Sequence, residues 1–220
     1  MKILVFSDTH LTADFSEKKY RFLSDIIHNA DKVIINGDFW EGYLNTFDEF
    51  INSPWKLLFP ILKQKNTVYI YGNHDRANLS DHRASLFSDL QTERFTLKIG
   101  TNTYVFEHGD KIVPLGSNDP DYYPNKFLLR RTNEIERFIV RHLGSRFIKA
   151  SYGRLNRTIK RHVEQNFTNN EIMFCGHTHY AEIDTPRRFV NSGIIKHGIG
   201  QYLWIQNGSG TIASKEEWYS

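Results

Sequence analysis

Short apolar runs rich in β-branched residues recur along the chain, and they constrain the fold more than any other feature. Near-continuous runs of this length are typical of strands buried on both faces of a sheet. Helix-like segments separate the runs, and alternating strands and helices predict an α/β sheet. The predicted strands are 2–6 (KILVF), 32–36 (KVIIN), 67–71 (TVYIY), 94–99 (RFTLKI), 103–108 (TYVFEH) and 171–175 (EIMFC).

The segments between the predicted strands carry helix signals. Apolar residues at helical spacing predict a helix over 17–30, and residues 47–65 are helical but interrupted by two prolines. A third helix is predicted over 80–90, with Ser80 as its N-cap. The end of the chain differs, because short strands there alternate with Gly, Asn and Pro turns, which predicts an antiparallel part.

The length and composition suit one globular domain spanning residues 1–220. A hydrophobic content of 40% and a charged content of 24% are ordinary for such a domain. No apolar stretch approaches the ~20 residues needed to cross a bilayer, and the first run is too short for a signal peptide. The single cysteine, Cys175, excludes an internal disulfide and is predicted to lie in the core. These features favour a cytoplasmic protein.

The positive charge is concentrated in one segment. Residues 126–166 hold 11 Lys and Arg against three Glu, a net charge of +8 in a chain whose total is +3. Apolar residues at helical spacing predict a basic helical insert at about 124–166, divided at Ser151-Tyr152-Gly153. Such an insert suits a lipid-linked substrate, an anionic membrane surface or a nucleic acid. The alternative is a solvated hairpin packed on its own domain.

Five polar clusters each follow an apolar, strand-like run. The carboxyl ends of strands are where open α/β sheets gather their sites, so the clusters are predicted to converge on one edge. Residues i and i+2 of an extended segment point to the same side, so DTH and GHTH each offer two ligands to one centre. A shared carboxylate at Asp38 would hold a second metal ~3.5–4 Å from the first. The clusters are DTH (Asp8, His10), GDFWE (Asp38, Glu41), GNHD (Asn73, His74, Asp75), EHGD (His108, Asp110) and GHTH (His177, His179).

Each motif taken alone has a plainer interpretation. Asp8 or Asp38 could cap a helix, and Asn73 could belong to a turn. His74 or His108 could be a loop histidine held by hydrogen bonds. Under that interpretation five ordered motifs are independent coincidences, so we favour a shared site. The remaining histidines are predicted to be surface or structural residues: His28, His82, His142, His162 and His197.

The ordered series DTH, GDFWE, GNHD, HGD and GHTH over residues 8–179 resembles that of the calcineurin-like metallophosphoesterases. The ending around NSG (191–193) is also similar, so the resemblance covers nearly the whole chain. It implies a four-layer α/β/β/α sandwich and two divalent transition-metal ions. Imidazole and oxygen ligands suit Mn, Fe, Zn or Co, and Mn is expected. The implied ligands are Asp8, His10, Asp38 and His179 for one metal, and Asp38, Asn73, His108 and His177 for the other.

The resemblance implies hydrolysis of a phosphodiester or pyrophosphate by a hydroxide that bridges the two metals. His74 lies beside the ligand set and is the candidate for protonating the leaving oxygen, with Asp75 or Glu41 to orient it. Two alternatives stay within the family, a nuclease and a phosphatase acting on cyclic nucleotides or phosphomonoesters. A third is a non-catalytic scaffold with the same fold.

Two features resemble one branch of the family, the UDP-2,3-diacylglucosamine hydrolases. The fourth motif reads HGD, and a helical insert follows it before GHTH. In that branch the insert is a lid over the acyl chains. The sequence departs from the branch at His74, where arginine is usual. The branch implies a lipid-linked phosphate ester as substrate and contact with the inner face of the membrane, and nucleic acid remains an alternative partner.

Overall fold

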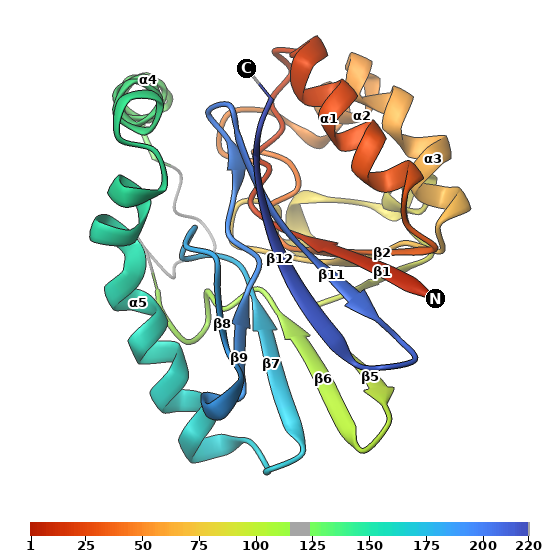
Figure 1. Cartoon of the computed structure of the whole chain (residues 1–220). Helices are drawn as coiled ribbons and strands as arrows, with labels where there is room; N and C mark the ends of the chain where they lie inside the picture. The colour runs from red at the N-terminus through yellow and green to blue at the C-terminus, as the bar shows by residue number, and fades with distance from the viewer. Residues whose placement is uncertain (115–123, 220) are drawn as a thin grey trace.

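Two β-sheets pack face to face between outer layers of helices in the computed structural model, which describes residues 1–114 and 124–219 (Figure 1). The expected four-layer α/β/β/α sandwich is confirmed. No helix in the described part of the chain is long and apolar enough to cross a membrane. The helices are α1 (Glu17–His28), α2 (Phe47–Asn52), α3 (Phe59–Gln64), α4 (Lys126–Leu143) and α5 (Ser145–Asn166).

The first sheet has the strand order β10-β11-β1-β2-β3-β4, and β12 also pairs with β11. Neighbours from β1 to β4 run parallel, whereas β11 is antiparallel to β1, β10 and β12. The antiparallel ending predicted from the turns is thus present here. The strands are β1 (Lys2–Phe6), β2 (Lys32–Asn36), β3 (Val68–Ile70), β4 (Leu90–Thr92), β10 (Ile195–Lys196), β11 (Ile199–Gln206) and β12 (Thr211–Trp218).

The second sheet has the order β5-β6-β7-β9-β8. Its middle strands β6, β7 and β9 run parallel, and the edge strands β5 and β8 are antiparallel to their neighbours. The end of the chain is therefore divided between the two sheets, which the turn pattern alone did not predict. The strands are β5 (Arg94–Ile99), β6 (Asn102–Glu107), β7 (Glu171–Cys175), β8 (Glu182–Asp184) and β9 (Phe189–Asn191).

Strand β1 shows why a continuous apolar run is needed. Ile3 and Val5 point into the layer between the sheets, whereas Leu4 and Phe6 pack under α1 to α3, and all four are fully buried. Successive strand residues face opposite sides, so a strand covered on both faces needs apolar side chains at every position. Full burial of each such side chain contributes roughly 1.5–3 kcal/mol. On the other outer face, Cys175 lies in the core beneath α5, as predicted.

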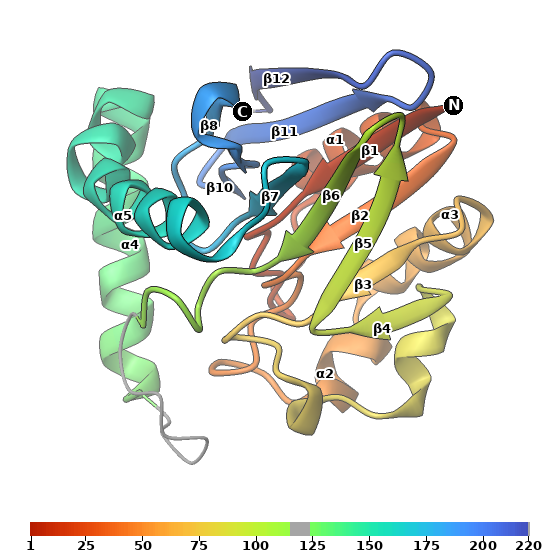
Figure 2. The same cartoon turned by 90° about the horizontal axis from the view of Figure 1, so that it is seen from below.

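The predicted basic insert is a helical pair, α4 and α5, but the predicted break is wrong. The chain turns at Gly144, where φ is +58°, and Gly153 continues within α5. Left-handed backbone favours glycine, whereas a glycine inside a helix costs only about 1 kcal/mol. Figure 2 shows α4 and α5 together at one side of the molecule, away from β3 and β4.

The predicted helix over 80–90 is also wrong. Only His82–Leu86 form a short 3-10 helix, and its cap is Asp81, whose side chain accepts the Arg83 N–H (2.9 Å). Leu90 already begins β4, which pairs with β3. The requirements of the sheet edge therefore override local helix propensity. The interrupted helix of 47–65 is confirmed as α2, a 3-10 turn and α3.

Candidate metal centre

The loops that follow five strands meet at one end of the two sheets. Backbone hydrogen bonds join them, from Asp8 N–H to Gly37 O (3.1 Å), from His10 N–H to Asp38 O (2.9 Å) and from Gly176 N–H to His108 O (3.0 Å). Motifs spread over 170 positions of sequence are thereby held in contact. The side chains come from these strands: Asp8 and His10 follow β1, Asp38 follows β2, Asn73 follows β3, His108 follows β6, and His177 and His179 follow β7.

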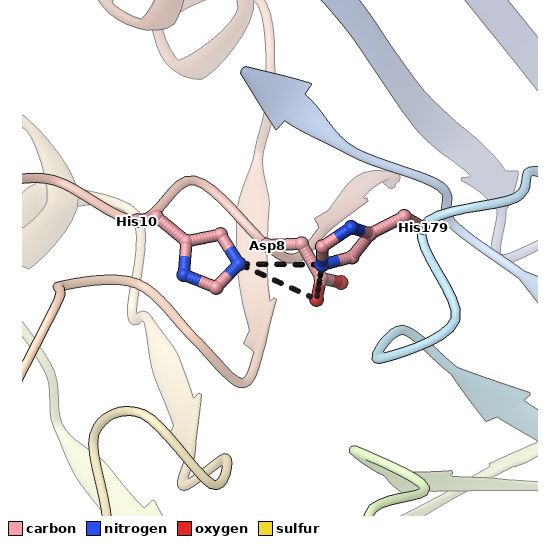
Figure 3. Close-up of side chains that lie close together, drawn as sticks. All are labelled: Asp8, His10 and His179. Carbon is pink, nitrogen blue, oxygen red and sulfur yellow. Dashed lines mark hydrogen bonds and ion pairs between the residues drawn. The ribbon is translucent and has the colours of Figure 1, made fainter. Parts of the chain in front are cut away.

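Three groups of side chains in the described part of the chain could hold a metal ion, and one of them, His10, Glu41 and His74, shares His10 with its neighbour. The first cluster consists of Asp8, His10 and His179 (Figure 3). The Nε2 atoms of the two histidines are 3.3 Å apart, and Asp8 Oδ1 lies 3.3 Å from the Nε2 of His179. The Asp8 carboxylate also accepts the His177 N–H (3.0 Å), which fixes its direction. Ligands bound about 2.0–2.2 Å from one ion have this order of separation. The cluster therefore fits a metal ion.

Asp38, His108 and His177 form the second cluster. His108 donates from Nδ1 to the Asn36 carbonyl (2.9 Å), which leaves Nε2 as the free nitrogen. His177 donates from Nε2 to the Val113 carbonyl (2.6 Å), which leaves Nδ1. Fixing one ring nitrogen in this way is how proteins orient metal-binding histidines.

Asn73 offers a further oxygen atom beside the second cluster. Its Oδ1 atom is buried and has no hydrogen-bond partner in the described part of the chain. A buried polar atom left without a partner costs roughly 1–3 kcal/mol, so each one in a native fold calls for an explanation. An amide oxygen next to the second cluster fits a metal ion as its partner.

Asp38 lies between the two clusters. Its Oδ2 atom is 3.2 Å from Nε2 of His108 and 3.8 Å from Nε2 of His10. Its Oδ1 atom accepts the His74 N–H (2.8 Å), so Oδ2 remains directed at both clusters. Burial opposes ionisation, but the charges of His108 and His74 outweigh it and hold the pKa of Asp38 well below its usual range. The carboxylate is therefore charged.

Left-handed backbone conformations are concentrated at the candidate ligands. Eight non-glycine residues in the described chain have positive φ, and five are ligands in these clusters. Each costs on the order of 1–2 kcal/mol in an ordinary residue. Strain of this kind is kept where function requires it. The five residues are Asp8, His10, Asp38, His177 and His179.

Two motif glycines make room for ligand side chains. A Cβ at Gly72 would lie 2.2 Å from Asp38 Oδ1, and a Cβ at Gly176 would lie 2.4 Å from Asp8 Oδ2. No carbon can approach an oxygen so closely without displacing it. The glycines of GNHD and GHTH are therefore needed for close packing of the centre.

Glu41 is the group that orients His74. Its carboxylate accepts from Nδ1 of His74 (2.7 Å) and from Nδ1 of His10 (3.0 Å). Burial lowers the pKa of His74, but Glu41 and Asp38 outweigh it and raise that pKa to about 9. Burial and the nearby His74 lower the pKa of His10 to about 4. The surroundings therefore favour the protonated form of His74 and the neutral form of His10, which is the form that binds metals.

The side chain of Asp75 joins two of the motif loops. Its carboxylate accepts backbone N–H groups of Asp38 (3.0 Å), Phe39 (2.6 Å) and Gly72 (2.7 Å). Burial and the charge of Asp38 raise its pKa to about 7. Asp75 therefore ties the GDFWE and GNHD loops together, and Glu41 takes the orienting role that the sequence left open between them.

Two asparagines support the GHTH loop, and motif reasoning did not assign either to the site. Asn191 donates from Nδ2 to Gly176 O (2.8 Å) and to Thr178 Oγ1 (2.9 Å). Asn156, on α5, accepts from Thr178 Oγ1 (2.5 Å) through Oδ1. The NSG motif was the available signal for Asn191. Asn156 had none, because only the fold brings α5 to this loop.

The insert also reaches the edge of the first cluster. The ring of Tyr152 lies 5.3 Å from that of His179, and its hydroxyl donates to Glu136 on α4 (2.9 Å). Glu136 in turn accepts from Lys196 (3.2 Å) and from Nε2 of His197 (2.8 Å). His197 is buried and structural, as predicted.

A cavity lies on each side of the centre. The larger, about 830 Å³, is lined in part by Asn73, His108 and His177. The smaller, about 420 Å³, is lined in part by His10 and Glu41. Each cavity therefore touches residues of a different cluster.

The two-sheet sandwich with His and Asp clusters at its strand ends defines the metallophosphoesterase class. Residues 1–203 match the model of the calcineurin-like phosphoesterase superfamily domain, and the chain belongs to this family.

The fold is also found in a distant solved structure. Vps29 complexed with Zn²⁺ from Entamoeba histolytica is 15% identical, with a TM-score of 0.50 and 100% of both chains covered. YfcE, a phosphoesterase from E. coli, is 15% identical, with a TM-score of 0.46 and the same coverage. At 15% identity, the likeness to Vps29 shows the shared fold alone. Comparison with proteins of curated function gave no match.

Proposed function

We propose that this protein is a hydrolase with a two-metal centre that cleaves a phosphodiester or pyrophosphate bond. The position of Asp38 carries the proposal. Its Oδ2 atom faces a ring nitrogen of each cluster, 3.2 Å and 3.8 Å away, as a carboxylate shared by two ions requires. A single bound ion or a structural ion pair would not need two complete ligand sets around one oxygen.

The donor set fits transition metals. Imidazole nitrogens together with carboxylate and amide oxygens suit Mn, Fe, Zn or Co better than Ca or Mg, and Mn is our first choice. Divalent ions held here would supply the positive charge that attracts a phosphate oxygen and acidifies a water molecule. The first ion would be held by Asp8, His10, Asp38 and His179, and the second by Asp38, Asn73, His108 and His177.

His74 supplies the proton in this proposal. Its side chain is 20% exposed, and Nδ1 is occupied by Glu41, so Nε2 is the nitrogen available to a substrate. A protonated imidazole held in this way can donate to the oxygen that leaves phosphorus. Glu41 acts through His74 and His10 and is a positioning residue.

The two cavities favour a diester over a monoester. A phosphate bound at the centre would have space for a substituent on either side, about 830 Å³ on one and about 420 Å³ on the other. A monoester would fill only one of them. We therefore include pyrophosphates and phosphodiesters in the proposal and rank phosphomonoesters lower.

The deciding experiment compares Asp38→Ala with Asp25→Ala, an exposed aspartate on α1. Hydrolysis of bis(4-nitrophenyl) phosphate with added Mn should fall by roughly a thousandfold or more in Asp38→Ala and stay unchanged in the control. Metal analysis should find two ions per wild-type chain and fewer in Asp38→Ala. Full turnover by Asp38→Ala would contradict the proposal.

A lipid-linked pyrophosphate is the substrate candidate that the surface of α4 favours. Phe127, Leu128 and Phe138 are 69%, 62% and 65% exposed, and they lie within the most basic segment of the chain. Apolar side chains flanked by cations suit the surface of an anionic membrane. We propose that α4 contacts such a membrane at its cytoplasmic face, as in the UDP-2,3-diacylglucosamine hydrolase branch.

Vesicle sedimentation tests the membrane contact. The double variant Leu128→Ser/Phe138→Ser should bind anionic vesicles at least about fivefold more weakly than wild type. Leu57→Ser, which removes a leucine 53% exposed on another face, should bind like wild type. Equal binding of all three proteins would remove the membrane from the proposal.

A substrate panel separates the remaining alternatives. It contains UDP-diacylglucosamine, cyclic nucleotides, mononucleotides, DNA and RNA, each with added Mn. Cleavage of the lipid-linked pyrophosphate alone would support the branch, whereas cleavage of DNA or RNA would identify a nuclease. A protein that bound no transition metal and cleaved none of them would be a non-catalytic module.

A further inference from the structure

The smaller cavity beside His10 carries an excess of positive charge. Five cationic side chains line it, and they come from α1, α4 and the end of β10. The acidic side chains that line it are Asp14 and Glu41, and both oxygens of Glu41 already accept from His10 and His74. The cations are Lys18, Lys19, Arg137, Arg141 and Lys196.

Most of these cations lack an ion-pair partner. Within residues 1–114 and 124–219, only Lys196 of the five forms a salt bridge, with Glu136 at 3.2 Å. A protein surface normally intersperses both signs of charge, and like charges gathered in a cleft raise the local concentration of counter-ions. The positive charges that line the cavity are therefore not balanced by negative charges of the described residues.

The lack of a counter-charge matters most for Lys19. Its side chain is only 8% exposed, and its ammonium group donates to the Thr9 carbonyl. Burial, Lys196 and Arg137 together lower its pKa well below the usual value, which favours the neutral amine unless an anion lies nearby. Lysine is almost never buried without a counter-charge, because loss of hydration is costly. An anion in the cavity would supply that counter-charge.

The larger cavity provides an internal comparison. Its lining includes three cations. Arg94 is neutralised by Glu107 at 2.7 Å and Lys111 by Glu93, and Arg76 donates to the Asn73 carbonyl (3.1 Å) and the Tyr43 hydroxyl (2.7 Å). Two cavities touch the same centre, yet only the one beside His10 leaves most of its cations unpaired. The difference points to unlike groups on the two sides of the substrate.

We propose that the cavity beside His10 binds a second anionic group of the substrate, a phosphate or carboxylate carried a few bonds from the phosphorus that is attacked. The inference rests on the proposed function, because it deepens the substrate class of the same centre. The cations of α1 and α4, which lie at the same end of the molecule, would then close on this group from two sides (Figure 1).

Matched substrates test the anionic group. The probes are 4-nitrophenyl phosphodiesters whose second ester is an alkyl chain of two to four carbons that ends in a phosphonate or in a hydroxyl. With Mn present, the best phosphonate should have a KM about tenfold lower than its hydroxyl partner, because charge-assisted bonds to Arg and Lys form. High salt should remove the preference, since the charges are partly exposed. Equal KM values throughout the series would overturn the inference.

Two arginines of α4 provide the variant and its control. Arg137→Gln removes a cation that lines the cavity, and Arg131→Gln removes one that pairs with Glu134 on the surface and does not line it. Arg137→Gln should lose most of the preference for the phosphonate, because KM should rise more for the phosphonate than for its hydroxyl partner. Arg131→Gln should keep the preference. The same loss in both variants would mean a general field effect and would overturn the assignment.

A binding experiment tests anion binding by the cavity independently of catalytic turnover. Inorganic phosphate is titrated into Asp38→Ala in the presence of a chelator, so that the metal centre does not contribute. Adding Arg137→Gln should weaken phosphate binding by about tenfold, and adding Arg131→Gln should not. The absence of phosphate binding, or equal weakening of binding by Arg137→Gln and Arg131→Gln, would contradict the cavity proposal. If phosphate binds as expected but no probe is hydrolysed, the proposed function fails and the cavity assignment stands.

Discussion

At the scale of the residue, the structure brings the predicted side chains together, although their backbone conformation differs from the one assumed from the sequence. The alternation of an extended chain was used to place Asp8 beside His10 and His177 beside His179. In the structure all four have left-handed backbone, with φ between 44° and 63°. The loops thus fold tightly after each strand and still direct each pair toward the centre. The sequence showed which residue types could bind a metal, because ligand chemistry restricts them. It did not show the backbone conformation of the loops that carry them.

The role of His74 leads to the first prediction. His74→Ala should reduce hydrolysis of an alkyl phosphodiester by roughly 100-fold or more, because an alkoxide leaves poorly without a proton. On a 4-nitrophenyl ester the same variant should lose only a few fold. Steady-state kcat/KM values on the two substrates give the ratio. Equal losses would show that His74 is not the acid.

Gly72 provides a second residue-level prediction. Gly72→Ala places a methyl group 2.2 Å from Asp38 Oδ1 and should displace the shared carboxylate. Turnover should fall by roughly 100-fold, the order expected for a displacement of about 1 Å. Metal analysis should show fewer ions per chain. Gly208→Ala, whose new methyl group meets nothing within 4 Å, is the matched control and should behave as wild type.

At the scale of the element, periodicity located the insert but not its contacts. Helix α5 buries Ile159 and Val163 against the second sheet, as its apolar spacing allows. It also carries Lys160, which donates to Glu182 (2.6 Å) and Asp184 (2.6 Å) of β8. From the sequence alone, a lysine in a basic helix is expected to be exposed to solvent. Only the tertiary contacts of Lys160 show that it is a structural residue.

Lys160→Met should lower the free energy of unfolding by roughly 1–3 kcal/mol near pH 7, because two carboxylates lose their buried partner. Lys160 lowers the pKa of Asp184 through the hydrogen bond they share. A depressed carboxyl pKa stabilises the fold above the unfolded value, about 3.9, and this contribution is lost as the pH falls below it. The difference between wild type and variant should therefore shrink below about pH 4. Urea unfolding at several pH values measures it, with the exposed Lys149→Met as control.

At the scale of the whole molecule, the centre joins the two sheets. Ligands of the first cluster come from both sheets, since Asp8 and His10 follow β1 whereas His179 follows β7. The second cluster likewise combines Asp38 with His108 and His177. Metal binding should therefore stabilise the sandwich as a whole and not one loop.

Metal removal tests this coupling. Mn at about 100 times its dissociation constant should add about 2.7 kcal/mol for one site. For a chain of this size, that corresponds to a rise in Tm of about 5–10 °C relative to protein in chelator. Asp38→Ala should lose most of the rise. An identical Tm with and without Mn in the wild type would contradict a bound metal centre.

The sequence by itself determined the strands, the ordered ligand types and the basic insert, because hydrophobic pattern and ligand chemistry are local properties of the chain. Only the tertiary structure decided that Glu41 serves both His10 and His74, that Asn156 supports the GHTH loop, and that α1, α4 and β10 gather an excess of cations beside the centre. These relations join residues far apart in sequence, and no periodicity specifies how distant segments approach one another once the sheets pack.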